Sequence, residues 1–402
     1  MTRCLWLARA APYPMNDGAS IATAKSIEGL AGTGTDVTAL GFAAPEGWTS
    51  SEPAARDPRV EWRIVQGGPR RALPALASAL PLVAARHRTA AYRAMLKKAL
   101  AEPWDAIMVD HYAMAWALPA LAAARDATGR RPVIAHLAHN FETEVSRAIL
   151  RDYQGDPVRK GLLYLNSRKT EALETRIAQT CDLVVALTDE DAASFAGLAA
   201  DLKTLVCFPG YDGERAAPRR TADAERRICM IGSLRWIAKQ MNLETFLKVA
   251  DPMFHAAGIT LDIIGDAPPE FVTRLTPGLK ATRFLGFVDS LPEAVKRYRM
   301  GLVIEETGGG FKLKTLDYIF GRLPVAALEG SFRGIPPAVA VNFIMGATAE
   351  KLAQAIVARI DDTEDLDGRQ ARAFDAAGGA FSWTANGRKL LAAFHRTATS
   401  PA

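Results

Sequence analysis

Short apolar runs alternate with longer helical segments along most of this chain, and that alternation is what most constrains its fold. The segments between the runs, such as 20–31, 112–125 and 155–179, repeat apolar residues with a period of about 3.6. This pattern is typical of βαβ units and predicts parallel sheets with helices on both faces. The predicted strands are 4–8, 36–42, 60–65, 104–110, 132–137 and 182–187 in the first half and 226–234, 259–265, 281–288, 299–306 and 324–328 in the second.

The alternation is interrupted by a polar segment at 200–225 that contains prolines, glycines and charges, and this segment predicts a linker. The 402 residues are enough for two domains of typical size. Ligands of such sheets bind at the carboxyl ends of the strands. We therefore predict an α/β protein of two Rossmann-like, doubly wound domains facing a central cleft, with domain limits at 1–205, 206–380 and 381–402.

The composition is that of a folded globular protein, with 49% hydrophobic and 23% charged residues. A formal net charge of +5 over this length is too small to predict a nucleic-acid partner. The four cysteines form no CxxC pair and no zinc-ligand spacing, which is typical of a reducing, cytoplasmic compartment. No apolar run is long enough to predict a membrane span, and 1–9 lacks the core of a signal peptide.

The first turn of each half lacks the common nucleotide-binding motifs. A nicotinamide-binding domain would have GxGxxG there, but 8–20 contains only Gly18 and 232–242 contains only Gly232. No GxxxxGK[ST] sequence occurs either. These absences argue against a nicotinamide-dependent oxidoreductase and against a P-loop NTPase.

The densest chemical signal is the segment 304–325, IEETGGGFKLKTLDYIFGRLPV. An apolar strand ends there at Glu305–Glu306, a glycine turn follows, and an amphipathic helix begins. Glycines let the backbone approach an anion, and helix N–H groups with nearby lysines suit a diphosphate. A carboxylate on the helix can accept hydrogen bonds from ribose hydroxyls. The alternative is a flexible glycine turn with solvated lysines. The residues concerned are Gly308, Gly309, Gly310, Lys312, Lys314 and Asp317.

The whole chain resembles the GT-B glycosyltransferases, and most closely their family 4. In that family a strand, a glycine-rich turn and a helix follow the form GxGxxLKxLEAMAxGxPVV, which GGGFKLKTLDYIFGRLPV matches almost position by position. The resemblance places Lys314 on the family's lysine and Asp317 on its ribose-binding glutamate. Further matching segments are 12–42, 138–149, 174–195, 232–242, 285–304 and 381–396.

The resemblance implies that the two domains bind different substrates. The nucleotide-sugar donor would bind in 206–380, the acceptor in 1–205, and a final helix in 381–402 would pack back on the first domain. Basic side chains would stabilise the departing diphosphate, so that neither a metal nor another cofactor is expected. The implied nucleotide-sugar-binding residues are Gly18, Arg235, Lys239, Phe287, Gly308, Gly309, Gly310, Lys312, Lys314 and Asp317.

The candidate catalytic residues are Asp17, Asp110 and His139. Asp110 ends one predicted strand and His139 follows the next, so both lie at carboxyl ends, where ligands bind. The resemblance implies that His139 touches the donor sugar or the reacting centre. The alternatives are a buried structural histidine for His139 and a helix N-cap of 112–125 for Asp110. Asp17 and Glu142 carry the same ambiguity.

Two classes of function are consistent with these residues. The first is transfer of a sugar from a nucleotide diphosphate sugar, UDP-linked in the first instance, to a glycan or lipid-linked acceptor in surface or exopolysaccharide synthesis. Family 4 members retain the anomeric configuration, and the resemblance implies the same here. The alternative is an inverting enzyme, which a catalytic aspartate would suit. The second class is a non-catalytic, GT-B-shaped binding or scaffold protein, because Gly309 replaces the first member of the family's glutamate pair and Asp317 shortens the second. Glu305–Glu306 also stand where related sequences often have Pro-Leu-Arg.

A basic and apolar stretch, 70–100, predicts peripheral contact with the inner face of a membrane. Cations interspersed with Leu, Ala and Val can lie on an anionic leaflet. The resemblance points the same way, because many GT-B enzymes with lipid-linked acceptors dock through this part of the chain. The alternative is a helix pair whose apolar face joins the core while its arginines stay in water. The cations are Arg70, Arg71, Arg86, Arg88, Arg93, Lys97 and Lys98.

Overall fold

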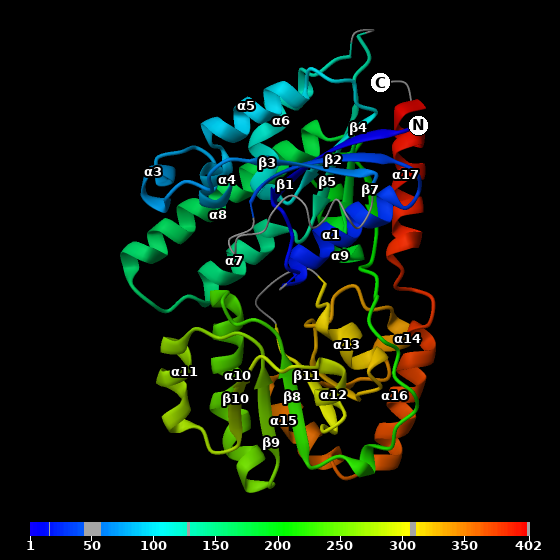
Figure 1. Cartoon of the computed structure of the whole chain (residues 1–402). Coiled ribbons are helices and arrows are strands. Elements are labelled where there is room, and N and C mark those ends of the chain that lie inside the picture. Colours follow the sequence, from blue (N-terminus) through cyan, green and yellow to red (C-terminus); the bar gives the residue numbers. More distant parts are fainter. Residues whose placement is uncertain (16, 44–57, 127–128, 306–310, 400–402) are drawn as a thin grey trace. The chain divides into compact units, whose positions relative to one another are not determined.

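The computed structural model describes residues 1–15, 17–43, 58–126, 129–305 and 311–399. The chain divides into two compact units, of which the first comprises Met1–Gly210 with Ser382–Ala402 and the second comprises Tyr211–Phe381. Each unit holds one parallel sheet covered by helices (Figure 1). The predicted α/β fold of two doubly wound domains is therefore confirmed.

The first unit has a seven-stranded sheet of order β3-β2-β1-β4-β5-β6-β7 in its described residues, and every pairing is parallel. Its strands are β1 (Arg3–Ala10), β2 (Asp36–Phe42), β3 (Val60–Val65), β4 (Ala106–Asp110), β5 (Val133–Ala138), β6 (Leu183–Ala186) and β7 (Lys203–Val206). Its helices are α1 (Gly18–Ala31), α3 (Ala72–Leu76), α4 (Leu82–His87), α5 (Ala90–Ala99), the 3₁₀ helix η1 (Tyr112–Ala117), α6 (Leu118–Ala122), α7 (Glu142–Asp152), α8 (Pro157–Thr180), α9 (Asp189–Ala196) and α17 (Trp383–Thr399).

The second unit has a six-stranded parallel sheet of order β10-β9-β8-β11-β12-β13 in its described residues. Its strands are β8 (Arg227–Ile231), β9 (Thr260–Ile264), β10 (Thr282–Gly286), β11 (Met300–Val303), β12 (Val325–Leu328) and β13 (Ile344–Gly346). Its helices are η2 (Thr221–Asp223), α10 (Ile237–Ala256), α11 (Pro269–Leu275), η3 (Thr276–Gly278), α12 (Leu291–Val295), α13 (Lys314–Phe320), α14 (Pro337–Ala340), α15 (Ala349–Arg359) and α16 (Thr363–Ala377).

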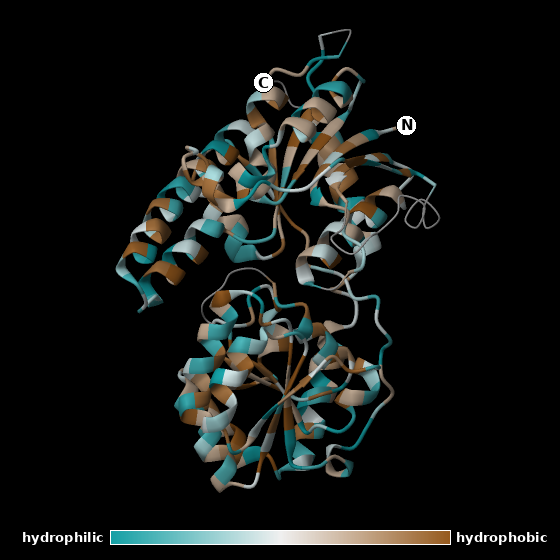
Figure 2. Ribbon diagram, turned by 60° about the vertical axis from the view of Figure 1, so that its left-hand side comes forward, coloured by the Kyte–Doolittle hydropathy of each residue, from teal (hydrophilic) through white to brown (hydrophobic). Residues whose placement is uncertain are grey.

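The strands form the apolar interior of each unit, as Figure 2 shows by the hydrophobic colouring along both sheets. Strands β4 and β5 are buried along their whole length because helices cover both faces of the sheet. This double cover explains why they read in the sequence as continuous apolar runs.

Three sequence predictions differ from the structure. The predicted linker 200–225 contains β7, a partly exposed edge strand that pairs with β6 and lacks a long apolar run. Strand β13 was not predicted, because it has three residues and one of them is exposed. The single helix predicted over 112–125 is a 3₁₀ turn followed by the short helix α6, which begins with Pro119 in its first turn.

Helix α17 packs against α1 within the first unit, and glycines set their spacing. A Cβ atom added at Gly387 would lie 1.9 Å from the carbonyl oxygen of Gly29, and one at Gly29 would lie 2.7 Å from that of Trp383. Any larger residue at either position would push the two helices apart. The end of the chain is thus held to the first unit by a close backbone contact.

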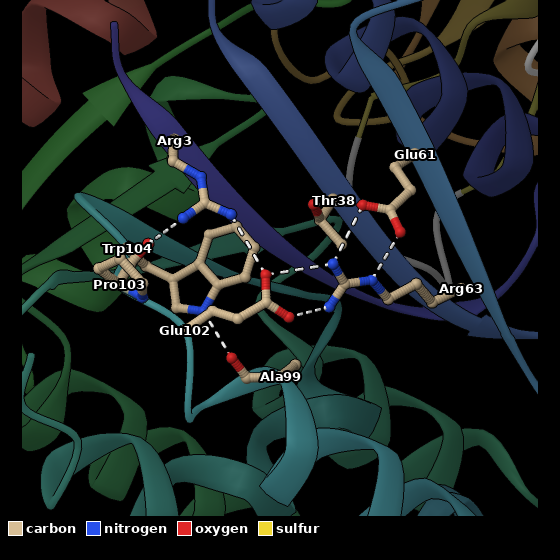
Figure 3. A network of polar contacts seen from close by, with 8 residues as sticks. All are labelled: Arg3, Thr38, Glu61, Arg63, Ala99, Glu102, Pro103 and Trp104. Atoms are coloured by element: carbon tan, nitrogen blue, oxygen red, sulfur yellow. Dashed lines mark hydrogen bonds and ion pairs between the residues drawn. The ribbon is translucent and has the colours of Figure 1, made fainter.

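A charged network ties the amino edge of the first sheet together (Figure 3). Arg63 on β3 donates to Glu61 and to Glu102, and Arg3 donates to Glu102 Oε2 at 3.2 Å. The hydrogen bond from Arg63 holds the pKa of Glu102 below its usual range. Arg3 also lies over the ring of Trp104, 4.6 Å from its centroid. Because Glu102 and Trp104 precede β4, this network supports the edge opposite the strand ends where ligands bind.

Candidate active site

In the second unit, strand order reverses between β8 and β11, which places a crevice at the carboxyl ends of these two strands. Tyr318 of α13 connects the two strands beside this crevice. Its hydroxyl accepts from Ile231 N at 2.8 Å and lies 3.3 Å from Leu302 O, so it links the end of β8 to β11. Gly301 leaves room for the ring, because a Cβ atom there would lie 2.6 Å from it. Helix α13 is therefore held firmly against the switch point.

A buried ion pair lies beside that point. Glu305 follows β11 and accepts a hydrogen bond from Lys314 Nζ at the start of α13. The side chains are only 2% and 9% exposed. Burial raises the pKa of Glu305, but the charge of Lys314 and its hydrogen bond hold it below the usual range. Lys314, predicted from the sequence to meet a diphosphate, thus has a carboxylate partner of its own.

Two further lysines act electrostatically on the same carboxylate. The charges of Lys312 and of Lys239, in the first turn of α10, also lower the pKa of Glu305. Three cations therefore share one buried anion, which leaves a net positive potential at the carboxyl ends of β8 and β11. Such a potential suits a bound anion of two or more charges.

Arg235 and Phe287, the other two predicted nucleotide contacts with long side chains, are on the same edge of the second sheet. Arg235 Nε donates to Asp266 Oδ2, just after β9, while most of its side chain remains exposed. Phe287 directly follows β10 and is 76% exposed, so its ring is open to a stacking partner. The sequence did not predict the Asp266 contact, which partly neutralises Arg235.

The backbones of Gly232 and Gly265 lie close together just after β8 and β9. Gly265 has a φ of 123°, and a Cβ atom there would lie 2.5 Å from the carbonyl oxygen of Gly232. No side chain stands at either position, so the strand ends remain accessible. The predicted phosphate turn of Gly308, Gly309 and Gly310 lies outside the described residues.

Asp317 lies on α13 next to Tyr318 and is partly buried. Within the described part of the chain its carboxylate has no hydrogen-bond or ion-pair partner, and burial raises its pKa to about 7. A carboxyl group in this setting is well placed to accept from hydroxyl donors of a ligand.

In the first unit, Asp110 and His139 meet at the carboxyl ends of β4 and β5. His139 Nε2 lies 2.6 Å from Asp110 Oδ1, and Trp6 Nε1 of β1 donates to Asp110 Oδ2 at 2.9 Å. Burial raises the pKa of Asp110, but the ion pair with His139 and these hydrogen bonds hold it below its usual range. The suggested role of Asp110 as a helix N-cap is wrong, because the neighbouring His111 performs it by accepting from Ala113 N at 3.1 Å.

His111 completes this cluster, although no sequence pattern singled it out. Its φ of 71° is a strained value for a residue with a side chain, and such strain is common at functional sites. Its ring centroid lies 5.4 Å from that of His139, and its Nε2 lies 4.0 Å from Glu142 Oε1. Burial and the charge of Arg9 hold the pKa of His111 well below its usual value.

A second buried carboxylate supports the cluster from α8. Glu174 is fully buried and accepts from the backbone N–H groups of Glu142 and Thr143, both at 2.7 Å. It thereby caps the first turn of α7. Burial raises the pKa of Glu174 to about 8 and also raises the pKa of Glu142. The turn that carries His139 and Glu142 is thus anchored to α8.

Asp17 has a local structural role. It is the N-cap of α1, where Oδ1 accepts from Ser20 N at 2.7 Å and Ser20 Oγ accepts from Asp17 N at 3.1 Å. Gly18 is the first residue of that helix. The capping alternative for Asp17 is thus observed, and contact of Asp17 or Gly18 with a substrate stays a prediction.

No group of three or more His, Cys, Asp or Glu in the described part of the chain has the arrangement of a metal site. Among the helices described, none combines the length and apolar character needed to cross a bilayer.

No protein-family model and no curated protein matches this chain in sequence. Solved structures match it in fold. Sucrose-phosphate synthase from Thermosynechococcus elongatus has a TM-score of 0.69 and 14% identity over 98% of this chain and 99% of its own. Anabaena HepE in complex with UDP-glucose has a TM-score of 0.64 and 16% identity over 98% of this chain and 100% of its own.

Staphylococcus aureus TarM, solved with fondaparinux, α-GlcNAc-glycerol and UDP, has a TM-score of 0.68 and 8% identity over 98% of this chain and 100% of its own. These identities are low, so the likeness is one of fold. The chain has the two-domain GT-B fold that these glycosyltransferases share.

Proposed function

We propose that this protein is a glycosyltransferase that moves a sugar from a nucleotide diphosphate sugar, UDP-linked in the first instance, to a glycan or lipid-linked acceptor. The observation that carries the proposal is the buried pair of Lys314 and Glu305 at the carboxyl ends of β8 and β11, where the charges of Lys239 and Lys312 also act. The fold supports it, because HepE was solved with UDP-glucose and TarM with UDP.

The second unit would bind the donor. Lys239 and Lys312 would meet the diphosphate, where negative charge grows as the sugar leaves. The buried pair with Glu305 would hold Lys314 in place beneath them, and its charge would add to the field. Asp317 would accept from the ribose hydroxyls, and Phe287 would offer its exposed ring to the base.

The first unit would act at the sugar and the acceptor. Because Asp110 is held in its ionised form, it accepts a hydrogen bond from His139 Nε2–H and fixes the orientation of the imidazole. His139 Nδ1 is then the atom available to the reacting sugar or the acceptor hydroxyl. Asp110 would be a positioning residue and His139 the catalytic one.

The finer features of the reaction follow from the resemblance to family 4. We propose that transfer retains the anomeric configuration and proceeds without a metal or other cofactor. The acceptor would belong to surface or exopolysaccharide synthesis, which places the enzyme in the cytoplasm, at the inner face of a membrane.

The test is release of nucleoside diphosphate from a panel of UDP-, GDP- and ADP-sugars, measured together with thermal unfolding in each nucleotide. A glycosyltransferase should slowly hydrolyse its donor and be stabilised by the matching diphosphate. Stabilisation without any turnover, including with glycan acceptors added, would instead identify a binding protein with this fold. No stabilisation by any nucleotide would contradict both functions.

A further inference from the structure

Two parts of the first unit carry many cations and no acidic residue. The segment 67–101 contains seven Lys or Arg and no Asp or Glu, and 157–170, the first half of α8, contains four and none. These eleven cations exceed the net charge of +5 of the whole chain. In the described residues an acidic partner is found only for Arg168, which pairs with Glu171. The cations are Arg70, Arg71, Arg86, Arg88, Arg93, Lys97, Lys98, Arg159, Lys160, Arg168 and Lys169.

The two acid-free parts are in direct contact. Lys169 Nζ of α8 donates to the carbonyl oxygens of Leu76 and Ser78, at 3.2 and 2.7 Å. The backbone N–H of Leu82, at the start of α4, donates to Asn166 Oδ1 at 2.8 Å. Helix α3 and the start of α4 therefore lie against the middle of α8, and the two acid-free parts adjoin there.

Large apolar side chains are exposed in these two acid-free parts. Helices α4 and α5 bury their apolar sides in the core, through residues such as Ala84, Tyr92 and Leu96. For these two helices the helix-pair alternative to membrane contact therefore holds. Helix α3 and the first turns of α8 do not bury their large apolar side chains in this way. The exposed fractions are 81% for Leu73, 38% for Leu76, 74% for Val158, 46% for Leu162, 54% for Tyr164 and 54% for Leu165.

We propose that these six exposed side chains and the eleven cations form a docking surface for an anionic lipid bilayer. The apolar side chains would enter the interface while the cations meet phosphate headgroups. Tyr164 suits the boundary, because it combines an apolar ring with a polar hydroxyl. A second copy of this chain is a poor occupant, since pairing two such surfaces would oppose cation to cation.

The docking surface is joined to the candidate active site through the hairpin of α7 and α8 (Figures 1 and 2). The turn between these helices lies at the exposed end of α8, whereas the start of α7 is capped by Glu174 beside Glu142. Docking would therefore hold this hairpin, and the strand ends that carry His139, at a membrane. The binding itself does not depend on the proposed sugar transfer.

The experiment is co-sedimentation of the full chain with phosphatidylglycerol–phosphatidylcholine vesicles and with vesicles of phosphatidylcholine alone, without nucleotide. Binding should require phosphatidylglycerol and weaken as salt rises, because salt screens the cations. The variant Leu162→Ser/Leu165→Ser should bind about tenfold more weakly, since two apolar side chains no longer enter the interface. Arg159→Gln/Lys160→Gln should lose about fivefold for each cation removed.

Val341→Ser is the matched control for the apolar variant, because Val341 is an exposed valine (68%) of the second unit. Arg297→Gln, another exposed site of that unit, is the control for the charge variant. Both controls should bind vesicles as the wild type does. Equal binding to uncharged vesicles, no binding at all, or unchanged binding by the Leu162 and Leu165 variant would overturn the proposal. So would a dimer that the same variant dissociates, since the surface would then join two copies.

Discussion

Lys314 and Glu305 form an ion pair buried at the carboxyl end of strand β11, with side chains 9% and 2% exposed. The chain thus places a carboxylate beneath the cations of its candidate nucleotide site. The pair explains how an acidic residue is accommodated where related sequences often have Pro-Leu-Arg, because Glu305 faces a cation.

Loss of one partner of this pair should destabilise the protein strongly. Lys314→Met leaves the Glu305 carboxylate buried without its counter-charge, and breaking a buried pair in this way typically costs about 3–5 kcal/mol. Adding Glu305→Gln to the same chain should recover much of that loss. The free energies of unfolding in urea measure both effects, and additive losses in the double variant would show that the two residues do not interact.

Lys239 should contribute to diphosphate binding and not to nucleoside binding. Lys239→Ala should weaken UDP binding by about tenfold or more, because a hydrogen bond to a charged group contributes roughly 1.5–3 kcal/mol. Calorimetric titration should show uridine binding unchanged. Lys248→Ala is the matched control, since Lys248 lies on the same helix, is 71% exposed and pairs with Glu244 at 3.8 Å. Equal effects of the two variants on UDP would remove Lys239 from the site.

Asp317 should make both stability and nucleoside binding depend on pH. Its pKa is raised from 3.8 to about 7 in the folded protein, so the unfolded chain loses this proton at lower pH than the folded chain does. The contribution of this group to stability therefore falls as pH rises from about 4 to about 7. Asp317→Asn should raise the melting temperature at pH 7, and the gain should shrink toward pH 4.

Asp317 should also make the affinity for a nucleoside depend on pH. An ionised Asp317 accepts from ribose hydroxyls better than a protonated one, so uridine should bind the wild type more tightly as pH rises through about 7. Uridine is the right probe, because it has no phosphate that titrates in this range. A parallel pH profile for Asp317→Asn would show that this carboxylate does not contact the ligand.

Asp110 should affect turnover more than nucleotide binding. Asp110→Asn keeps the size of the side chain but removes the charge that orients His139, so turnover should fall about 100-fold or more. UDP affinity should stay within about twofold, because the nucleotide is assigned to the second unit. The pH profile of turnover should also change, which a purely structural role would not produce. His255→Ala, at an exposed position near the end of α10, is the control.

The sequence was informative about the backbone and about strand ends. Continuous apolar runs located both sheets, and because the carboxyl ends of parallel strands share one edge, Asp110 and His139 could be expected near each other. Short edge strands such as β7 and β13 carry no such run and were missed.

Side-chain partners were less predictable from the sequence. The contacts of Lys314 with Glu305 and of Arg235 with Asp266 depend on rotamers and on loop paths that no spacing encodes. The strained backbone of His111 has no sequence signature beyond its position after Asp110. The exposed leucines of α8 were hidden for a similar reason, since an apolar helix segment normally indicates burial.

The proposed function requires that the second unit binds a nucleoside diphosphate at the carboxyl ends of β8 and β11. Thermal unfolding of the full chain with UDP, and with NAD as the control, tests it most directly. At about 100 times its dissociation constant, UDP should add roughly 2.7 kcal/mol to the free energy of unfolding, whereas NAD should add nothing. A melting temperature that UDP, GDP and ADP all leave unchanged in a folded sample would contradict the account.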